Sequence, residues 1–373
     1  MSAFVVDVDS HIMEPPDLWL KYLEPQHRDR AIFIRQAPGG EELVIDGQVL
    51  MKGRLASLGG VEHDAATLFM QPDVPYLDGC PAASMNTDAR IRLLDDWGVT
   101  AGVVFPTIGI LWDKPEDPEL AIAYARAYNN WQWDFAKPAL DRIVPIAHVP
   151  LYDVDLAYAE LARCVKLGFK GMFLAPEPVN GKRPSDPEFD RLWALLEEAQ
   201  LPVCVHLIVR FNRVVNEAAT RWYDRGFMNT VFAFGIGGTS QLIPATASLV
   251  CDGLFDRFPK LKVVMVESGA GYAAYLMDRL DEKFERFRSL VPIKRKPSEY
   301  FRENLWFVMD PSERSIDAQC DLVGEDRFVW GSDYPHIDSH IDAVAEVRRA
   351  VSSMSPHRQK LILGENARRL FNL

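Results

Sequence analysis

The sequence has fewer basic than acidic residues. Lys and Arg number 41 against 53 Asp and Glu, which gives a formal net charge of -12. Binding to nucleic acid depends on clustered Lys and Arg that neutralise phosphates, and a chain of this charge repels a phosphate backbone. We therefore expect no nucleic acid among its partners.

Long apolar stretches are also missing. No uninterrupted apolar run approaches the roughly 18 residues that a membrane-spanning helix requires. The first residues, MSAFVVDVDSH, do not combine a basic start with a long apolar stretch. The sequence therefore predicts no membrane anchor and no secretion leader.

Cysteine is scarce and lacks the spacing of a metal site. The five cysteines form no CxxC pair, and their number is odd (Cys80, Cys164, Cys204, Cys251 and Cys320). Disulfides belong to oxidising compartments, whereas reduced, buried thiols are typical of the cytoplasm. We expect free thiols and a cytoplasmic protein.

Internal repeats and low-complexity tracts are absent, and short apolar runs alternate with helical patterns along the whole chain. Hydrophobic residues make up 48% of 373 residues, which is enough for one sizeable core. Two helical patterns are clear, at residues 153–167, followed by Gly168, and at residues 187–199. The apolar runs lie at residues 3–8, 101–105, 143–148, 171–174, 202–207, 262–266, 304–308 and 327–330. Eight strands with intervening helices predict an α/β fold that closes into a (β/α)8 barrel.

Two stretches are too long to be simple connections. Residues 30–88 contain a β-meander pattern at 31–50, and residues 208–245 include a glycine-rich, aromatic stretch at 230–243. Insertions that follow barrel strands lie over the C-terminal mouth and line the substrate site. The motif GIGGTS within the second insertion lacks the Lys and the strand-to-helix context of a phosphate-binding loop. We expect one domain over residues 1–373, with both insertions at its mouth and no nucleotide site.

Acidic and imidazole side chains follow four of the predicted strands. The first strand carries Asp7, Asp9 and His11, which alternation along an extended chain places on one side. The fifth, sixth and eighth strands end in His206, in Glu267, and in Asp333 and His336. Strand ends of a barrel converge on one mouth, and imidazoles with carboxylates and no thiol suit zinc, manganese or iron. The pattern favours a metal site.

The same residues have a plainer interpretation. In it Asp9 and Asp333 are buried carboxylates that shape strand ends by hydrogen bonding, and the histidines fill polar gaps. A single Asp or His at a strand end is more often structural than a ligand. Because four strand ends supply such groups in one barrel, we favour the metal site over this alternative.

Several motifs together carry a family resemblance. VDVDSHIMEP, LPVCVH, VESGAG, WGSDYPH and GENARRLF occur in this order and span almost the whole chain. The chain resembles the amidohydrolase-related family of the amidohydrolase superfamily, in the branch that includes 2-amino-3-carboxymuconate-6-semialdehyde decarboxylase and γ-resorcylate decarboxylase. The resemblance implies a distorted (β/α)8 barrel, one divalent ion with zinc expected before manganese or iron, and a homodimer or homotetramer.

Carried over by position, the resemblance implies four metal ligands. Asp9 and His11 take the place of the first-strand pair, His206 that of the fifth-strand histidine, and Asp333 that of the eighth-strand aspartate. Many relatives have His-x-His on the first strand, where this chain has Asp-x-His. A carboxylate at that position still ligates, so the metal site is expected to persist.

Two further positions depart from the family pattern and bear on catalysis. Glu267 stands where the decarboxylases carry a sixth-strand His, and His336 stands where well-known decarboxylases carry Phe after the Tyr-Pro pair. We expect Asp333 to shuttle a proton as well as ligate. Either Glu267 or His336 is expected to be the second acid–base group.

Substrate contacts are expected from two other residues. Arg210, close after His206, is able to bind a substrate carboxylate bidentately, although a surface loop position is the plainer interpretation. Glu14 follows His11 by three positions and is able to reach the mouth, or else it is a loop carboxylate. His148, at the end of the third strand, is expected to be a core histidine.

These residues predict an enzyme that acts on a small molecule. We expect metal-dependent, non-oxidative decarboxylation of a small carboxylated, aromatic-derived substrate. Hydrolysis of a C–C, ester or amide bond at the same ion is the first alternative, kept close by Glu267 in place of His. A metal-free barrel that binds ligands without chemistry is the second.

Overall fold

A computed structural model describes residues 4–209 and 230–373 of the chain. Within these ranges, parallel strands form the sheet orders β1-β5-β6 and β7-β8-β9-β10-β11-β12. The bounds are β1 (Val6–Ile12), β5 (Ala101–Pro106), β6 (Ile143–Pro145), β7 (Ala147–His148), β8 (Met172–Leu174), β9 (Val203–His206), β10 (Val263–Val266), β11 (Leu305–Met309) and β12 (Phe328–Trp330). Because only Ile146 separates β6 from β7, the two act as one strand, and the eight predicted strands are confirmed.

The barrel closes between β1 and the segment that follows β12. Tyr334 forms a parallel bridge with Ser10. The backbone N–H groups of Ser332 and Asp333 both donate to the Asp9 carbonyl, at 3.0 and 2.8 Å. The predicted (β/α)8 barrel is therefore correct, and its closing seam runs beside a residue expected to bind metal.

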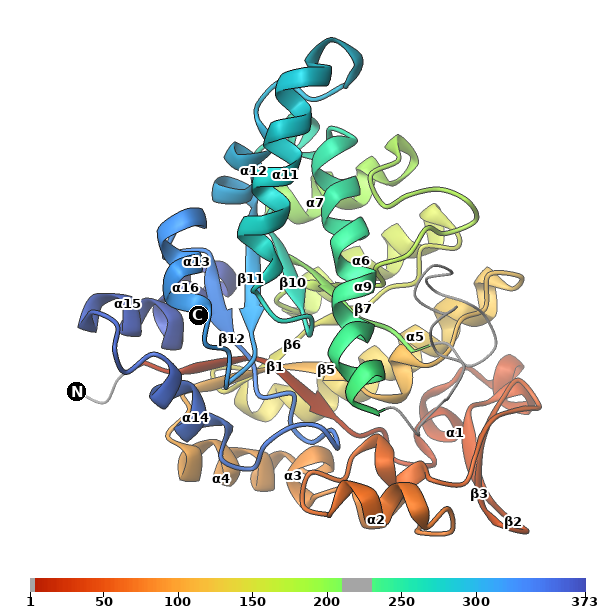
Figure 1. The fold of residues 1–373 in the computed structure, drawn as a ribbon. Coiled ribbons are helices and arrows are strands. Elements are labelled where there is room, and N and C mark those ends of the chain that lie inside the picture. The colour runs from red at the N-terminus through yellow and green to blue at the C-terminus, as the bar shows by residue number, and fades with distance from the viewer. Residues whose placement is uncertain (1–3, 210–229) are drawn as a thin grey trace.

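Helices surround the strands (Figure 1). The longer ones are α4 (Thr87–Trp97), α5 (Pro118–Ala136), α6 (Val154–Leu167), α7 (Asp190–Ala199), α9 (Thr230–Cys251), α11 (Tyr272–Phe287), α12 (Pro297–Asn304), α13 (Ile316–Val323) and α14 (Ala343–Ala350). Shorter ones are α1 (Leu18–Tyr22), α2 (Ala65–Met70), α3 (Ala82–Met85), α10 (Leu254–Arg257), α15 (Pro356–Lys360) and α16 (Asn366–Phe371). None of the helices in the described ranges combines the length and apolar character that crossing a bilayer requires.

The helix that begins at Val154 shows why the sequence predicted its bounds. The Asp153 carboxylate accepts hydrogen bonds from the backbone N–H groups of Asp155 and Leu156, which caps the first turn. Gly168 ends the helix with a left-handed φ of 111°, a conformation that glycine adopts without steric cost.

Alternation along the strands separates two apolar layers. On β10, Val263 and Met265 pack in the layer between strands and helices, whereas Val264 and Val266 pack inside the barrel. This is the inward and outward alternation of barrel strands. On β9 the inward residues are Cys204 and, at the strand end, His206, so the alternation directs the histidine into the mouth.

The first insertion contains the predicted meander. Strands β2 (Phe33–Ala37), β3 (Gly40–Ile45) and β4 (Gln48–Lys52) pair antiparallel in that order. The following segment packs over the C-terminal ends of the barrel strands. The Tyr76 hydroxyl donates to the Glu14 carbonyl at 3.0 Å, and the Val61 N–H donates to the Pro335 carbonyl at 3.1 Å.

The second insertion is described from residue 230. The glycine-rich stretch that we expected to wall the mouth is helical and belongs to α9. This helix runs beside α11, and its first turns lie near α2 (Figure 1), where the Phe69 and Phe234 rings are 6.4 Å apart. Glycine disfavours helices locally, so packing against the barrel outweighs local preference here.

Replacing Ser332 with Ala is expected to destabilise the closing seam. The Ser332 hydroxyl and backbone N–H donate to the two oxygens of the buried Asp7 carboxylate, at 2.6 and 2.9 Å. Loss of the hydroxyl leaves a buried acceptor without its donor, which costs about 1–3 kcal/mol. The free energy of unfolding in urea measures this.

Ser352→Ala is the matched control. Ser352 is exposed, and its hydroxyl donates to the Arg349 carbonyl at 2.7 Å. Surface substitutions of this kind change stability by less than about 0.5 kcal/mol. Equal losses in the two variants would contradict the proposed importance of the seam.

Candidate active site

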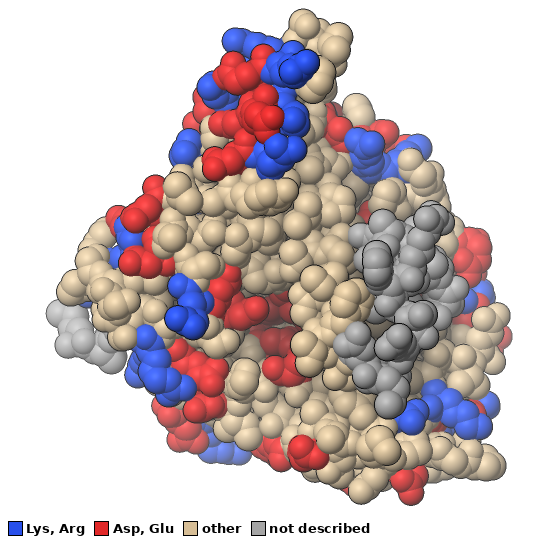
Figure 2. Space-filling model, in the orientation of Figure 1, with Lys and Arg blue, Asp and Glu red and all other residues tan. Residues whose placement is uncertain are grey.

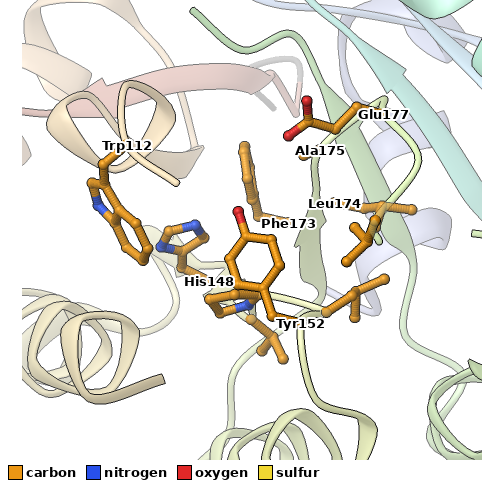
Figure 3. A pocket seen from close by; sticks show the side chains of 11 residues that line it. Trp112, His148, Tyr152, Phe173, Leu174, Ala175 and Glu177 are labelled. Carbon is orange, nitrogen blue, oxygen red and sulfur yellow. The ribbon is translucent and has the colours of Figure 1, made fainter. Parts of the chain in front are cut away.

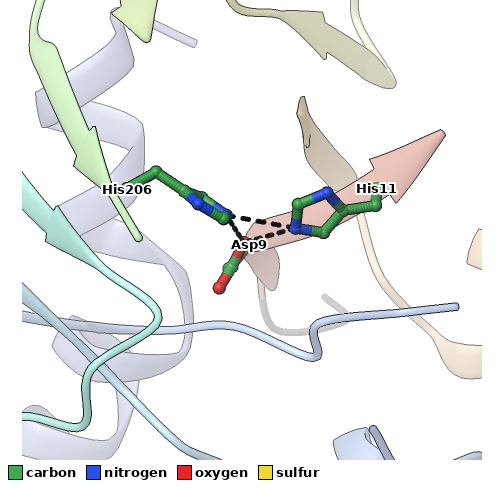
Figure 4. A group of neighbouring side chains, drawn as sticks. All are labelled: Asp9, His11 and His206. Carbon is green, nitrogen blue, oxygen red and sulfur yellow. Dashed lines mark hydrogen bonds and ion pairs between the residues drawn. The ribbon is translucent and has the colours of Figure 1, made fainter. Parts of the chain in front are cut away.

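Three side chains from two strands meet at the mouth of the barrel (Figure 4). Asp9 and His11 come from β1 and His206 from the end of β9, and the three point toward one another. Asp9 Oδ1 lies 3.4 Å from His11 Nε2 and 3.6 Å from His206 Nε2. The two Nε2 atoms are 3.1 Å apart. These groups lie close enough for one cation to contact all three.

The hydrogen bonds of the two imidazoles determine which ring nitrogen carries the proton. Nδ1 of His11 is 2.9 Å from the Pro106 carbonyl, and Nδ1 of His206 is 2.8 Å from the Leu207 carbonyl. A carbonyl only accepts, so each Nδ1 is the donor and each Nε2 of a neutral ring presents a lone pair. Burial lowers the pKa of His11 to about 3, which keeps that ring neutral. Two lone pairs thus face each other, an arrangement that a metal ion stabilises.

Two carboxylates stand on either side of this group in the left-handed backbone region. Asp333 has φ of 56° and Glu267 has φ of 57°. Oδ1 of Asp333 lies 3.3 Å from His11 Nε2, and Oε2 of Glu267 lies 3.3 Å from His206 Nε2. Non-glycine residues adopt this conformation at an energetic cost that concentrates at functional sites. The strained backbone aims both carboxylates at the histidine nitrogens.

Negative charge accumulates around the histidines. Figure 2 shows acidic side chains in a hollow near the middle of the face drawn. Glu267, Asp333 and Asp338 have carboxylate oxygens within 4.8 Å of one another. Burial raises the pKa of Asp333 and of Glu267 well above the ordinary values, and nearby carboxylates raise both further. Burial also raises the pKa of Asp310 to about 6. A cation in the hollow would relieve this repulsion.

The pKa of the Asp9 carboxylate shifts in the opposite direction. Burial raises the pKa of Asp9, whereas positive charge placed at the two imidazoles lowers it below the ordinary value. A cation bound between these groups would therefore keep Asp9 ionised among acids that resist ionisation. A buried carboxylate beside two imidazoles is the donor set of a zinc, manganese or iron site.

Unsatisfied oxygens test whether this site fits a metal ion. Asp9 Oδ1, Glu267 Oε2 and Asp333 Oδ1 are buried and make no hydrogen bond with the described part of the chain. Buried acceptors without donors are costly, and native structures leave few of them. Three of them converging on two imidazole lone pairs fit a divalent cation.

His336 lies beside the residues that could bind a metal ion, and a hydrogen bond on the far side of its ring holds it there. Its Nδ1 is 2.8 Å from Asp333 Oδ1, a close contact without hydrogen-bond alignment. Its Nε2 is 3.1 Å from the Thr107 hydroxyl, which donates to the Ile12 carbonyl at 3.2 Å. The hydroxyl has one hydrogen, so it accepts from His336 Nε2–H. The Nδ1 lone pair then faces Asp333.

Glu14 follows β1 and holds the loop after β5. Its carboxylate is fully buried and accepts from the backbone N–H groups of Thr107, Ile108 and Gly109 at 2.8–3.2 Å. The loop that it holds carries Thr107 and so supports His336. Within the described part of the chain, Glu14 makes no hydrogen bond or ion pair with Asp9, His11, His206 or Asp333, and its expected contact with substrate stays a prediction.

The structure contradicts the expectation for Asp7 and does not describe Arg210. Asp7 does not join Asp9 and His11, because the register of β1 against β5 shifts between Asp7 and Ser10 and the Asp7 carboxylate binds Ser332. The expected shared side for all three residues is therefore wrong. Arg210 lies outside the described residues.

Aromatic side chains line a small pocket (Figure 3). Trp112, His148 and Phe173 line it, together with Tyr152 and Glu177. The ring of His148 lies 5.0 Å from the ring of Phe173, which in turn lies 5.7 Å from the ring of His206. His148 is buried, as expected of a core histidine, yet it also faces this pocket. Its volume is about 30 Å³, which is room for a water molecule or two and too little for an aromatic ring.

Sequence reasoning missed several of these residues. Thr107 directly follows a strand, so the rule that strand ends converge could have indicated it. Trp112 and Asp338 stand in loops several residues beyond strand ends, where no periodicity marks them.

The chain is similar in sequence to one protein family and to a decarboxylase. The family model described as Amidohydrolase matches residues 89–373. The γ-resorcylate decarboxylase of Rhizobium sp. (strain MTP-10005) is 28% identical over 299 residues, which cover 77% of this chain and 87% of the relative.

Solved structures share the fold. An amidohydrolase from Mycobacterium avium subsp. paratuberculosis K-10 gives a TM-score of 0.83 at 24% identity, with both chains covered in full. A dihydroxybenzoic acid decarboxylase from Polaromonas sp. JS666, solved with manganese and the inhibitor 2-nitroresorcinol, gives a TM-score of 0.68 at 20% identity. It covers 100% of this chain and 97% of its own.

Replacing Glu14 with Gln is expected to change how stability depends on pH. Burial raises the pKa of Glu14 from 4.5 to about 7, so the folded state holds a proton that the unfolded state releases. The stability contributed by this group is complete below pH 4.5 and is lost as pH rises through about 7. From pH 5 to 8 the wild type should lose on the order of 1–3 kcal/mol relative to Glu14→Gln.

Urea unfolding at several pH values measures this difference. Glu62→Gln, at an exposed position, is the control and should follow the wild type across the range. Parallel curves for the wild type and Glu14→Gln would show that the buried carboxylate does not titrate in this window.

Proposed function

The chain belongs to the amidohydrolase family, and from this premise we propose that it is a metal-dependent, non-oxidative decarboxylase of a small carboxylated, aromatic-derived substrate. The observation that carries the proposal is the pair of imidazole lone pairs 3.1 Å apart, flanked by buried carboxylate oxygens without donors. Two of the proteins compared above are named as decarboxylases, which supports the reaction class.

Asp9, His11, His206 and Asp333 would hold the ion. Their donor atoms come from both sides of the seam and from β9, and each imidazole is already oriented by its Nδ1 hydrogen bond. A divalent cation held there supplies positive charge that stabilises the anionic oxygens of a substrate carboxylate and its neighbouring hydroxyl. Zinc, manganese and iron all suit this donor set, and manganese is the ion in one of the related structures.

Asp333 and His336 are the proposed proton carriers. Decarboxylation breaks the bond between a ring carbon and the carboxylate, releases CO2 and leaves an electron pair on that carbon. A proton must replace the lost group. Asp333 would carry that proton beside the reacting carbon, with His336 Nδ1 2.8 Å away as its exchange partner and Thr107 holding the far side of the imidazole, and solvent would restore the proton afterwards.

Aromatic side chains near the histidines would contact the rest of the substrate. The Phe173 ring lies 5.7 Å from the His206 ring, and Trp112 lies on the other side of a pocket of about 30 Å³. These side chains would have to move apart to admit a ring, which would then be oriented for loss of CO2 with its carboxylate toward the metal ligands. Because acidic side chains line the hollow, an anionic substrate would enter it only when the cation is bound.

Hydrolysis at the same ion is the second proposal. Glu267 supports it, because its Oε2 lies 3.3 Å from His206 Nε2, where a carboxyl group would act on an attacking water. A panel of hydroxybenzoates assayed for CO2, beside matched ester and amide substrates assayed for hydrolysis, separates the two reactions. A metal-free binding barrel would give neither product.

The wild-type protein is expected to hold about one zinc, manganese or iron ion per chain, and Asp9→Ala/His206→Ala/Asp333→Ala to hold none. The variant lacks both an anionic and an imidazole ligand, so its site cannot compete with water. Elemental analysis after reconstitution measures the content. His340→Ala, whose side chain is 55% exposed, should keep the metal. Equal metal in the triple variant would place the ion elsewhere.

Asp333→Asn is expected to reduce kcat by at least about 10²-fold, the contribution of a positioned acid–base group. The folded state should persist, because the amide keeps the shape of the carboxylate. Turnover of a substrate identified in the panel and the thermal midpoint are measured together. Asp321→Asn, on an exposed side chain, is the control. Unchanged turnover in Asp333→Asn would remove this residue from the mechanism.

A further inference from the structure

The glycine-rich sequence GGTSQ, residues 237–241, has no part in the function proposed above. It lies within α9, where this helix packs against β9 and against the residues that follow β10. Its contacts with those strand ends are specific and are made by three of its residues.

Gly238 lets the helix touch the backbone of Glu267. A Cβ at Gly238 would lie 2.2 Å from the Glu267 carbonyl oxygen, closer than real Cβ atoms approach backbone. The next residue, Thr239, donates its hydroxyl to the Ser268 carbonyl at 2.8 Å. The helix therefore packs directly on the two residues in which the chain leaves β10, the first of which has the left-handed φ described above.

Gln241 holds the corresponding point after β9. Its Oε1 accepts from the Ile208 N–H at 3.1 Å, and its Nε2 donates to the Ile208 carbonyl at 3.0 Å. The Ile208 N–H and the Leu207 carbonyl belong to one planar peptide unit. That carbonyl accepts the Nδ1–H of His206, so fixing one end of the plane fixes the partner that orients the imidazole.

We propose that residues 237–241 of α9 are a positioning element that sets the His206 imidazole for cation binding and holds the Glu267 carboxylate beside it. The inference rests on the metal site of the proposed function. It adds a mechanism by which the helix between β9 and β10 positions the C-terminal ends of both strands. Through one close approach and three hydrogen bonds, α9 couples the geometry of β9 to that of β10.

The first test compares two glycine-to-alanine changes in the same helix. Gly238→Ala forces α9 away from Glu267, whereas Gly235→Ala places its Cβ where no atom lies within 4 Å. Binding of Mn²⁺, followed by electron paramagnetic resonance titration, should weaken at least about ten-fold in Gly238→Ala, as it does when groups that orient metal ligands are removed. Gly235→Ala should match the wild type. Equal affinities in the two variants would overturn the proposal.

The second test does not require the metal. Gln241→Leu keeps the side-chain size and removes both bonds to Ile208. In the metal-free protein, ¹⁵N resonances of the imidazoles should show that His206 leaves its fixed Nδ1–H tautomer in Gln241→Leu and keeps it in Gly235→Ala. An unchanged His206 signal in Gln241→Leu would overturn the proposal. This test still decides the question if Gly238→Ala fails to fold. If the wild type binds no Mn²⁺, the proposed function fails, and the His206 signal still decides the positioning role.

Discussion

The seam between β1 and the segment after β12 is the constraint on which the site depends. Gly331 lies so close to β1 that a Cβ there would be 2.2 Å from the Asp9 Cβ. This approach allows the Asp9 carbonyl to accept two backbone N–H groups from the segment that follows β12. The same backbone atoms thus close the barrel and bring Asp333 beside Asp9 and His11. Closure of the barrel and assembly of the site therefore depend on the same backbone contacts.

The sequence was sufficient for the barrel and for the residues at its strand ends. Apolar runs located the strands because each is buried on both faces, and the convergence of strand ends then grouped His206 with Asp9 and Asp333. Alternation failed for Asp7, since a register shift within β1 is a property of the strand pair and leaves no mark in one strand's residues. The same limit applies to α9, where Gly238 is explained only by the Glu267 backbone that it touches.

Partners supplied by loops were harder to predict than those supplied by strands. Thr107 and Glu14 support His336 through a chain of contacts that links three separate segments. No single segment has a pattern that shows this link, because loops lack the period that marks a buried face. The sequence leaves the roles of Glu267 and His336 open for the same reason, because the distance of each group from the substrate depends on how the loops pack.

The left-handed backbone at Glu267 and Asp333 has a consequence for protein engineering. Glycine or asparagine at these two positions would relieve backbone strain and remove two carboxylates that repel their neighbours. Selection for thermostability alone would therefore enrich substitutions at the very residues that the chemistry is proposed to use. A library screened for stability should keep both positions fixed, and the protein retains part of its instability as a condition of having an active site.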